Sequence, residues 1–236
     1  MTAGHHFRNE GSGRARIGLP ARRQGLRLGR MSGRWLILSL LCVCLGLGAC
    51  GRRLTAPETD LAARLFGPGL DVTPVRLSET GLVGLRQARM PERPRTTCRE
   101  QLALPSADGW VTTRTAGVVL GNRINIRGGL MRPDFAQTTE GAMNLGAAMF
   151  LAHELTHVWQ AQNRALTGYS LWRAGLEHRP GQDPYLFDDR TAPRFLDYAY
   201  EQQASLVEEY VCCQALDPGG ARTGRCLLYT SPSPRD

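Results

Sequence analysis

Two stretches of the chain carry apolar residues in patterns that predict helices of a globular core. Residues 145–152 are apolar on almost every side and contain no proline, which predicts a helix buried in a core. Residues 193–216 carry a broad apolar face at helical spacing, and residues 217–220 end this second helix. A shorter helix is predicted over residues 57–66, where Pro57 and Glu58 suit the first turn.

Short strands are predicted between these helices. Residues 72–77 favour a strand at a sheet edge, because Pro74 cannot donate a backbone hydrogen bond. Residues 117–120 and 123–127 flank Gly121-Asn122 and favour a hairpin. Residues 91–94 are expected to form a loop, and residues 168–193 a long irregular region that could cover a cleft. Helices and strands together predict an α+β fold.

The buried helix continues into His153-Glu154-Leu155-Thr156-His157, which carries the most informative chemistry of the chain. A helix repeats every 3.6 residues, so both imidazoles project from one face as half of a zinc site. Glu154 could reach a water on the metal without occupying a coordination position, as a general base does. The alternative is a pair of hydrogen-bonded core histidines, but burying them with a carboxylate and Gln160 is costly unless all find partners.

A catalytic zinc usually takes three protein ligands and leaves the fourth position to water. The metzincin class is excluded, because Gln160 and Asn163 stand where that class has Gly and His. A glutamate zincin takes its third ligand from a later helix. We assign Glu201, which lies inside the second predicted helix beside small residues that would let the two helices approach closely. The remaining candidates are Glu177, which lies in a stretch that is hardly helical, and Glu208 and Glu209, which would orient a histidine or remain surface charges.

Composition is compatible with one globular domain, since 42% of the 236 residues are hydrophobic. The formal net charge of +8 invites a nucleic-acid partner, but its distribution excludes one. Eight arginines lie in the first 34 residues, whereas residues 51–225 hold 20 arginines and 19 acidic residues. The chain contains no lysine, which removes lysine-based catalysis.

The N-terminal pattern predicts a secreted lipoprotein. After Arg34, an apolar run suits a secretory signal core better than a membrane span, and Leu47-Gly48-Ala49-Cys50 resembles the lipobox whose cysteine is diacylated. We expect residues 1–30 to be a non-native or disordered leader, residues 31–49 a signal peptide, and residues 50–56 an acylated tether. The protein would then be lipid-anchored through Cys50 in the cell envelope, in the outer or cytoplasmic membrane, facing the periplasm. An ordinary signal peptide or an anchor helix is the alternative.

The C-terminal residues 226–236 resemble translated adapter sequence and are expected to be non-native. Residues 57–217 would form the catalytic domain and residues 218–225 a tail. Three cysteines remain in a compartment that permits disulfides, and Cys98 could pair with Cys212 or Cys213. A cysteine-rich zinc site is excluded, because the chain has no Cys-x-x-Cys spacing.

An ordered set of motifs resembles the bacterial Vgr-related zinc metallopeptidases. The resemblance covers most of residues 54–216. It implies a zincin-like fold of the glutamate class, in which a small β-sheet and hairpin region packs on the buried helix and on a second ligand-bearing helix, with Glu201 matching the third ligand. The motifs are Leu54-Thr55-x-x-Glu58, Phe66-Gly67, Val75-Arg76-Leu77, residues 153–160, Glu201-Gln202-Gln203-Ala204 and Glu209-Tyr210.

These residues favour zinc-dependent hydrolysis of a peptide or protein substrate. Zinc on His153, His157 and Glu201 would activate a water, and Glu154 would take its proton and later deliver it to the leaving amine. Several side chains could stabilise the oxyanion, and the sequence does not choose among Tyr169, His178, Tyr185, Tyr198 and Tyr200. A catalytically silent zinc-binding scaffold lipoprotein of the envelope or secretion machinery is the main alternative, and a metal-free lipoprotein is another. Neither the substrate's identity nor the oligomeric state follows from the sequence.

Overall fold

The computed structural model describes residues 51–179, 182–188 and 194–230, which belong to one compact unit. The predicted leader, signal peptide and Cys50 lie outside the described residues, as do residues 231–236. The described part combines helices with two small sheets, so the predicted α+β class is confirmed. Within it, we find no helix with the length and apolar character that crossing a membrane requires.

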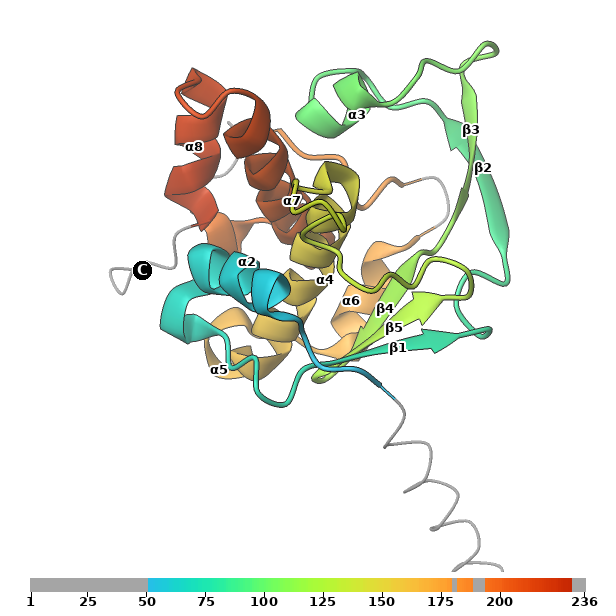
Figure 1. Cartoon of the computed structure of the whole chain (residues 1–236). Helices are drawn as coiled ribbons and strands as arrows, with labels where there is room; N and C mark the ends of the chain where they lie inside the picture. Colours follow the sequence, from blue (N-terminus) through green and yellow to red (C-terminus); the bar gives the residue numbers. More distant parts are fainter. Residues whose placement is uncertain (1–50, 180–181, 189–193, 231–236) are drawn as a thin grey trace, which may run out of the picture. The chain divides into compact units, whose positions relative to one another are not determined.

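Two packed helices, α4 (Leu145–Gln162) and α7 (Tyr200–Leu216), form the centre of the fold (Figure 1). Asn144 caps the start of helix α4, and its side chain accepts a hydrogen bond from the backbone of Ala147. The helix is buried on nearly every side, as its apolar sequence predicts. Polar side chains on its inner faces must therefore find partners within the protein.

Helix α2 (Ala56–Phe66) packs against α4 and is fixed at its start by a capping box between Thr55 and Glu58. Glu58 is fully buried, and its carboxylate also accepts two hydrogen bonds of 2.7 Å from Arg52 and one of 2.8 Å from the backbone of Phe135. This buried carboxylate ties three segments together and is fully paired. A short 3₁₀ turn, η1 (Gly67–Gly69), follows the helix.

The larger sheet has three strands in the order β1 (Arg76–Thr80), β5 (Arg123–Arg127) and β4 (Gly117–Leu120). Strand β5 pairs in parallel with β1 and antiparallel with β4. Leu77, Ile124 and Ile126 are completely buried and join the same core as α4. Strand β4 forms the edge of this sheet and contacts α4, which brings the edge strand beside the histidine-bearing helix.

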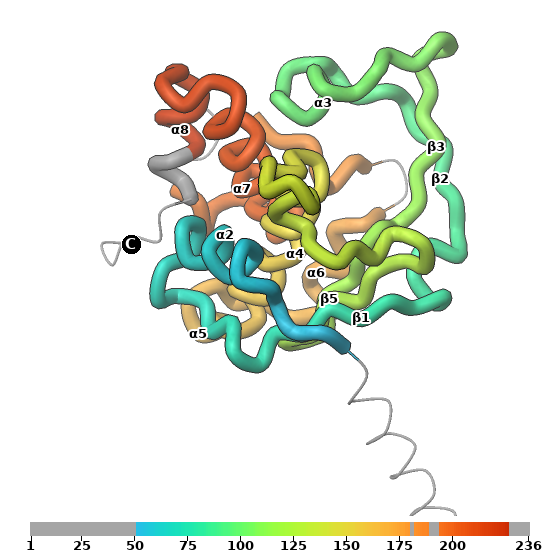
Figure 2. Tube along the Cα trace, viewed as in Figure 1, coloured from blue at the N-terminus to red at the C-terminus, as the bar shows by residue number. Residues whose placement is uncertain are grey.

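A second, two-stranded sheet forms an arm, which we define as residues 87–114. Its antiparallel strands are β2 (Gln87–Pro91) and β3 (Trp110–Arg114), and the short helix α3 (Cys98–Leu102) lies between them in sequence. Figures 1 and 2 show the two strands at the side of the fold and α3 turning back toward α7. Neither strand buries a face. The arm therefore lacks the hydrophobic alternation that would have predicted its strands from the sequence.

The structure corrects several predicted boundaries. The strand predicted over residues 72–77 is wrong in position: residues 72–75 form a turn, closed by a 3.1 Å hydrogen bond from the Val75 backbone to Val72, and β1 begins at Arg76. The second long helix begins at Tyr200 rather than at residue 193, after a 3₁₀ turn, η2 (Phe195–Asp197). The short helix α5 (Arg164–Thr167) follows α4, and the predicted irregular region contains α6 (Leu171–Glu177). Helix α6 buries no residue, so no apolar pattern marked it.

The C-terminal segment also differs from the prediction. Residues expected to form a tail belong to α8 (Ala221–Thr230), which packs against α7 and buries Thr223 and Cys226. The helix also includes residues 226–230, which had been set aside as non-native sequence, so its full pattern was not used for prediction. The choice left open for Cys98 is resolved: it forms a disulfide with Cys212, and Cys213 is a buried free thiol.

Candidate metal centre

His153, His157 and Glu201 converge at the interface of α4 and α7. The Nε2 atoms of His153 and His157 lie 3.2 and 3.3 Å from the same oxygen, Oε2 of Glu201. All three side chains are buried, and their ligand atoms lie within 4.8 Å of one another. Helical spacing places the imidazoles one turn apart, with rings almost perpendicular at 79°. The three residues form a group that could hold a metal ion.

Gln160 fixes the tautomer of His157. The amide nitrogen of Gln160 donates to the backbone oxygen of Tyr200 and to Gln203 Oε1, at 3.0 and 2.9 Å. The amide oxygen therefore faces His157, whose Nδ1 lies 2.9 Å away and must donate its proton. The Nε2 lone pair of His157 is left pointing toward Glu201. A chain of hydrogen bonds thus orients this imidazole as a metal ligand requires.

Glu208 holds His153 in the corresponding way. Its Oε2 lies 3.3 Å from Nδ1 of His153 and 2.9 Å from Nη1 of Arg99. Burial alone would lower the pKa of His153, but hydrogen bonds to Glu201 and Glu208 outweigh that effect and raise it to about 10. Burial alone would raise the pKa of Glu208, but His153 and Arg99 lower it. Glu208 is one of the two glutamates expected to orient a histidine, and it contacts His153.

Two neighbours position Glu201. His178 Nε2 lies 2.9 Å from the other oxygen of Glu201, Oε1, so that Oε2 remains for the histidine pair. Glu177 accepts hydrogen bonds from the backbone nitrogens of Tyr200 and Glu201, at 2.9 and 3.0 Å, and so caps the start of α7. Glu177, a weaker ligand candidate in the sequence, therefore fixes the helix that carries the ligand. Burial would raise the pKa of Glu201, but the three histidines lower it.

The chemistry of these donor atoms fits a cation. Two imidazole nitrogens and a carboxylate oxygen point their lone pairs at one small, buried space, and such an arrangement is stable only when protons or a cation lie between them. Two histidines and a glutamate are a ligand set that zinc takes in catalytic sites. The further hydrogen bonds that such ligands need are already made by Gln160, Glu208 and His178.

Glu154 projects from α4 toward the edge strand β4. Its carboxylate lies so close to Gly117 that a Cβ atom there would be 2.5 Å from Glu154 Oε1. Burial raises the pKa of Glu154 above its ordinary value. A buried carboxylate with a raised pKa binds a proton more readily than an exposed one, as a residue that transfers protons must.

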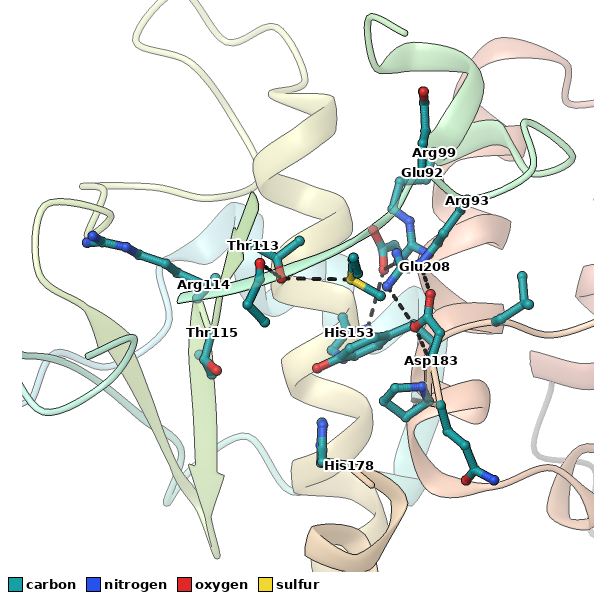
Figure 3. A pocket seen from close by; sticks show the side chains of 18 of the residues that line it. Glu92, Arg93, Arg99, Thr113, Arg114, Thr115, His153, His178, Asp183 and Glu208 are labelled. Carbon is teal, nitrogen blue, oxygen red and sulfur yellow. Dashed lines mark hydrogen bonds and ion pairs between the residues drawn. The ribbon is translucent and has the colours of Figure 1, made fainter. Parts of the chain in front are cut away.

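A cavity of about 1060 Å³ opens beside these residues. The arm, residues 115–117, helix α4, and residues 178–179 and 182–186 line it, and His153 and Glu208 face it (Figure 3). Glu154 is also part of the lining. In the close view, Arg93 and Asp183 lie near His153, whereas Arg114 extends away from it. The volume is at the upper end of the range of small-molecule sites and would admit several residues of an extended chain.

Of the five oxyanion donors considered, the structure brings His178 and Tyr185 into the cavity lining. The Tyr185 ring lies 5.7 Å from the ring of His153 and 5.8 Å from that of His178. Burial and the nearby Glu201 and Glu154 raise the pKa of Tyr185, so its hydroxyl keeps its proton. The hydroxyls of Tyr198 and Tyr200 turn elsewhere, because Tyr198 donates to the backbone of Asp188 and Tyr200 to that of Gly168. The Tyr169 ring packs on Tyr200, and burial together with the nearby Glu201 and Glu154 raises the pKa of Tyr169 to about 12.

Glu209, the other candidate for orienting a histidine, instead accepts hydrogen bonds from the backbone of Cys98 at 2.8 and 2.9 Å.

The sequence had not indicated the roles of some other residues around the site. Arg99 and Gly117 reach the site from distant segments, and no local pattern marked them. Gln160 could have been found, because it lies three residues after His157 on one helical face.

Sequence comparison finds no protein-family model and no curated protein that matches the chain. Among solved structures, the chain is similar to the effector domain of Pseudomonas aeruginosa VgrG2b, with 20% sequence identity and a TM-score of 0.49. The match covers 81% of this chain and 95% of that domain.

Proposed function

We propose that the chain is a zinc-dependent peptidase. The observation that carries this proposal is the convergence of His153 Nε2 and His157 Nε2 on Oε2 of Glu201, with Glu154 beside them facing an open cavity. A metal that only tied two helices together would need no buried carboxylate beside an open cleft, and a structural zinc usually closes all four positions with protein ligands. The geometry therefore favours catalysis over a silent zinc scaffold.

The proposed chemistry divides among the residues of the site. When bound by His153, His157 and Glu201, zinc would polarise a substrate carbonyl and make water acidic enough to react near neutral pH. Glu154 would accept the proton of the attacking water and pass it to the leaving amine. Tyr185 keeps its hydroxyl proton and would donate a hydrogen bond to the oxyanion, while His178 stays hydrogen-bonded to Glu201.

The edge strand β4 offers a place for an extended substrate. The backbone nitrogen of Arg127 in β5 donates to Ala116, which directly precedes β4. In an antiparallel pair the hydrogen-bonding direction alternates, so the polar backbone groups of the next residue, Gly117, face away from β5. A peptide added at this edge would place a carbonyl near Glu154. Because Gly117 has no side chain, the substrate backbone could also approach closely.

We further propose that the protein acts in the bacterial cell envelope, anchored by a lipid on Cys50. The lipobox-like residues 47–50 support this proposal, and so does the Cys98–Cys212 disulfide, because disulfides persist mainly outside the cytoplasm. Acylation is tested by the mass of the protein from cells with and without globomycin. A protein with Cys50→Ala that stays bound to the membrane would contradict the anchor.

The peptidase proposal is tested by metal content together with cleavage of a proteome-derived peptide library. Wild-type protein is expected to hold about one zinc and to cut peptides, whereas His157→Ala should lose both properties. Zinc binding without cleavage of any peptide would support the scaffold instead. Absence of bound zinc at micromolar metal would contradict both.

A further inference from the structure

The arm is attached to α7 at the start of α3, close to the metal ligands. Cys98 starts α3 and is bonded to Cys212, while its backbone nitrogen donates to both oxygens of Glu209. Arg222 of α8 donates a hydrogen bond of 2.6 Å to the backbone of Thr96, next to this joint. The start of α3 is therefore held by a covalent bond and by several hydrogen bonds.

Arg99 directly follows Cys98, and it is linked to the metal ligand His153 through Glu208. Its Nη1 lies 2.9 Å from Oε2 of Glu208, and the same oxygen lies 3.3 Å from Nδ1 of His153. Nε and Nη2 of Arg99 bond Glu100 at 3.0 and 2.9 Å, which fixes the direction of the guanidinium. Figure 3 shows Arg99 and Glu208 in line above His153.

We propose that Arg99 is a positioning residue of the metal centre, and that the Cys98–Cys212 disulfide keeps it in place. This inference rests on the proposed metal site. Arg99 acts through Glu208, which in turn orients His153. The arm thus forms one wall of the cavity and also supports a metal ligand.

The physical reason is the cost of a buried charge. Glu208 is almost completely buried, and an ionised carboxylate there needs a cationic partner. When a metal occupies Nε2 of His153, the ring is neutral and gives Glu208 only one hydrogen bond. Arg99 then holds the Glu208 carboxylate by a charge-assisted hydrogen bond in the position where its Oε2 accepts from Nδ1. Without Arg99, Glu208 would turn away, and His153 would lose its orientation.

The expected effect is a loss of metal affinity. Removing a direct partner of a metal-bound histidine typically costs about 10- to 100-fold in affinity. Arg99 acts one step further out, so Arg99→Gln should weaken zinc binding about tenfold. Arg99→Lys should recover part of that loss, because lysine keeps the charge beside Glu208 but not the forked contact with Glu100. Cobalt-substituted Arg99→Gln should show a shifted visible absorption spectrum.

A matched control is Arg95→Gln. Arg95 lies in the same arm and braces α3 through hydrogen bonds of 2.7 and 2.9 Å to the backbones of Ala103 and Gln101. It makes no contact with Glu208 among the interactions of the described residues. This variant should leave zinc affinity and the cobalt spectrum unchanged, even if the melting temperature falls.

The disulfide is tested by a cycle of variants. Cys98→Ser with Cys212→Ser should weaken zinc binding about tenfold, because Arg99 is no longer held in place. Adding Arg99→Gln to this pair should cost little more, whereas two independent effects would multiply to about a hundredfold. A multiplicative result would overturn the role assigned to the disulfide.

The measurement is zinc affinity, by competition with a chromophoric chelator, on full-length protein whose folding is checked by circular dichroism. If the protein with Cys98→Ser and Cys212→Ser does not fold, the Arg99 variants are a sufficient test of the role of Arg99, because they keep the disulfide. Wild-type affinity in folded Arg99→Gln would overturn the inference and leave the proposed function standing. Failure of wild-type protein to bind zinc would overturn both.

Discussion

The carboxylate of Glu154 lies against the backbone of Gly117, at a distance that leaves no room for a side chain on the strand. A Cβ at position 117 would be 2.5 Å from Oε1 and 2.6 Å from Cδ of Glu154. Helix α4 and strand β4 are therefore fitted to each other at the proposed general base. This relationship gives the first prediction.

Gly117→Ala should lower peptide cleavage at least about tenfold, because the added methyl group must push the Glu154 carboxylate out of place. Zinc affinity should change little, since Glu154 is not assigned as a ligand. Gly128→Ala is a suitable control, because its Cβ would meet only the Thr80 backbone oxygen, at 3.9 Å. Full activity in Gly117→Ala would show that Glu154 need not occupy the observed position.

Gln160→Ala should weaken zinc binding by about 10- to 100-fold, because His157 loses the partner that fixes its tautomer. Isothermal titration of zinc into both proteins measures the difference. Gln162→Ala serves as the control: Gln162 lies on the same helix, but it hydrogen-bonds Asp71 and Asn122 at the other side. Equal losses in both variants would point to a general loosening of α4.

Zinc binding should become tighter as the pH rises. In the metal-free protein the carboxylates of Glu201 and Glu208 raise the pKa of His153 to about 10, so its imidazole is protonated at pH 7 and must lose that proton to bind metal. Apparent affinity should therefore rise up to about tenfold per pH unit below that pKa, and the proton release should appear as buffer-dependent heat. Affinity that does not change between pH 6.5 and 8.5 would contradict this coupling.

The same raised pKa determines how the metal-free protein responds to pH. Protonated His153 stabilises the fold below its unfolded-state pKa of about 6.5, and that contribution disappears as the pH rises toward the folded-state value of about 10. Metal-free protein should therefore lose stability over this range. Zinc-loaded protein should not show this decrease, because its His153 has already lost the proton. Thermal melts at several pH values, with and without a chelator, make the comparison.

Removing the metal should lower the melting temperature. A ligand that binds only the folded state stabilises it by about 4 kcal/mol at a free concentration 1,000 times its dissociation constant. For a domain of this size, that corresponds to a shift of roughly 10 °C. Calorimetry before and after chelation, followed by readdition of zinc, measures the effect. A melting temperature that does not respond to zinc would argue that the histidines are ordinary core residues.

Prediction from the sequence succeeded where burial and function leave a local pattern. Helix α4 is buried on nearly every side, and its apolar sequence predicted the helix. Its two histidines, one turn apart, indicated a metal site. The hairpin of β4 and β5 was marked by Gly121-Asn122 between two short apolar runs. In each case, neighbouring residues carried the information.

Contacts between distant segments could not be predicted in this way. The arm buries no strand face, so nothing in its residue pattern marked β2 and β3 as strands, and nothing indicated that Arg99 would meet Glu208. Helix α8 was not predicted, because its second half lies in the residues set aside as adapter sequence, although Arg222 helps to fasten the arm. Glu201 was chosen among four glutamates by its position inside a predicted helix beside small residues, and the family resemblance matched the same residue.

The most direct test of the proposed function compares wild type with Glu154→Gln for bound zinc and for the rate of peptide cleavage in the same preparation. The variant is expected to retain about one zinc per chain and to lose cleavage by about 10²- to 10⁴-fold, the usual contribution of a general base. Unchanged cleavage by zinc-loaded Glu154→Gln would contradict the assignment of Glu154 and, with it, the proposed mechanism.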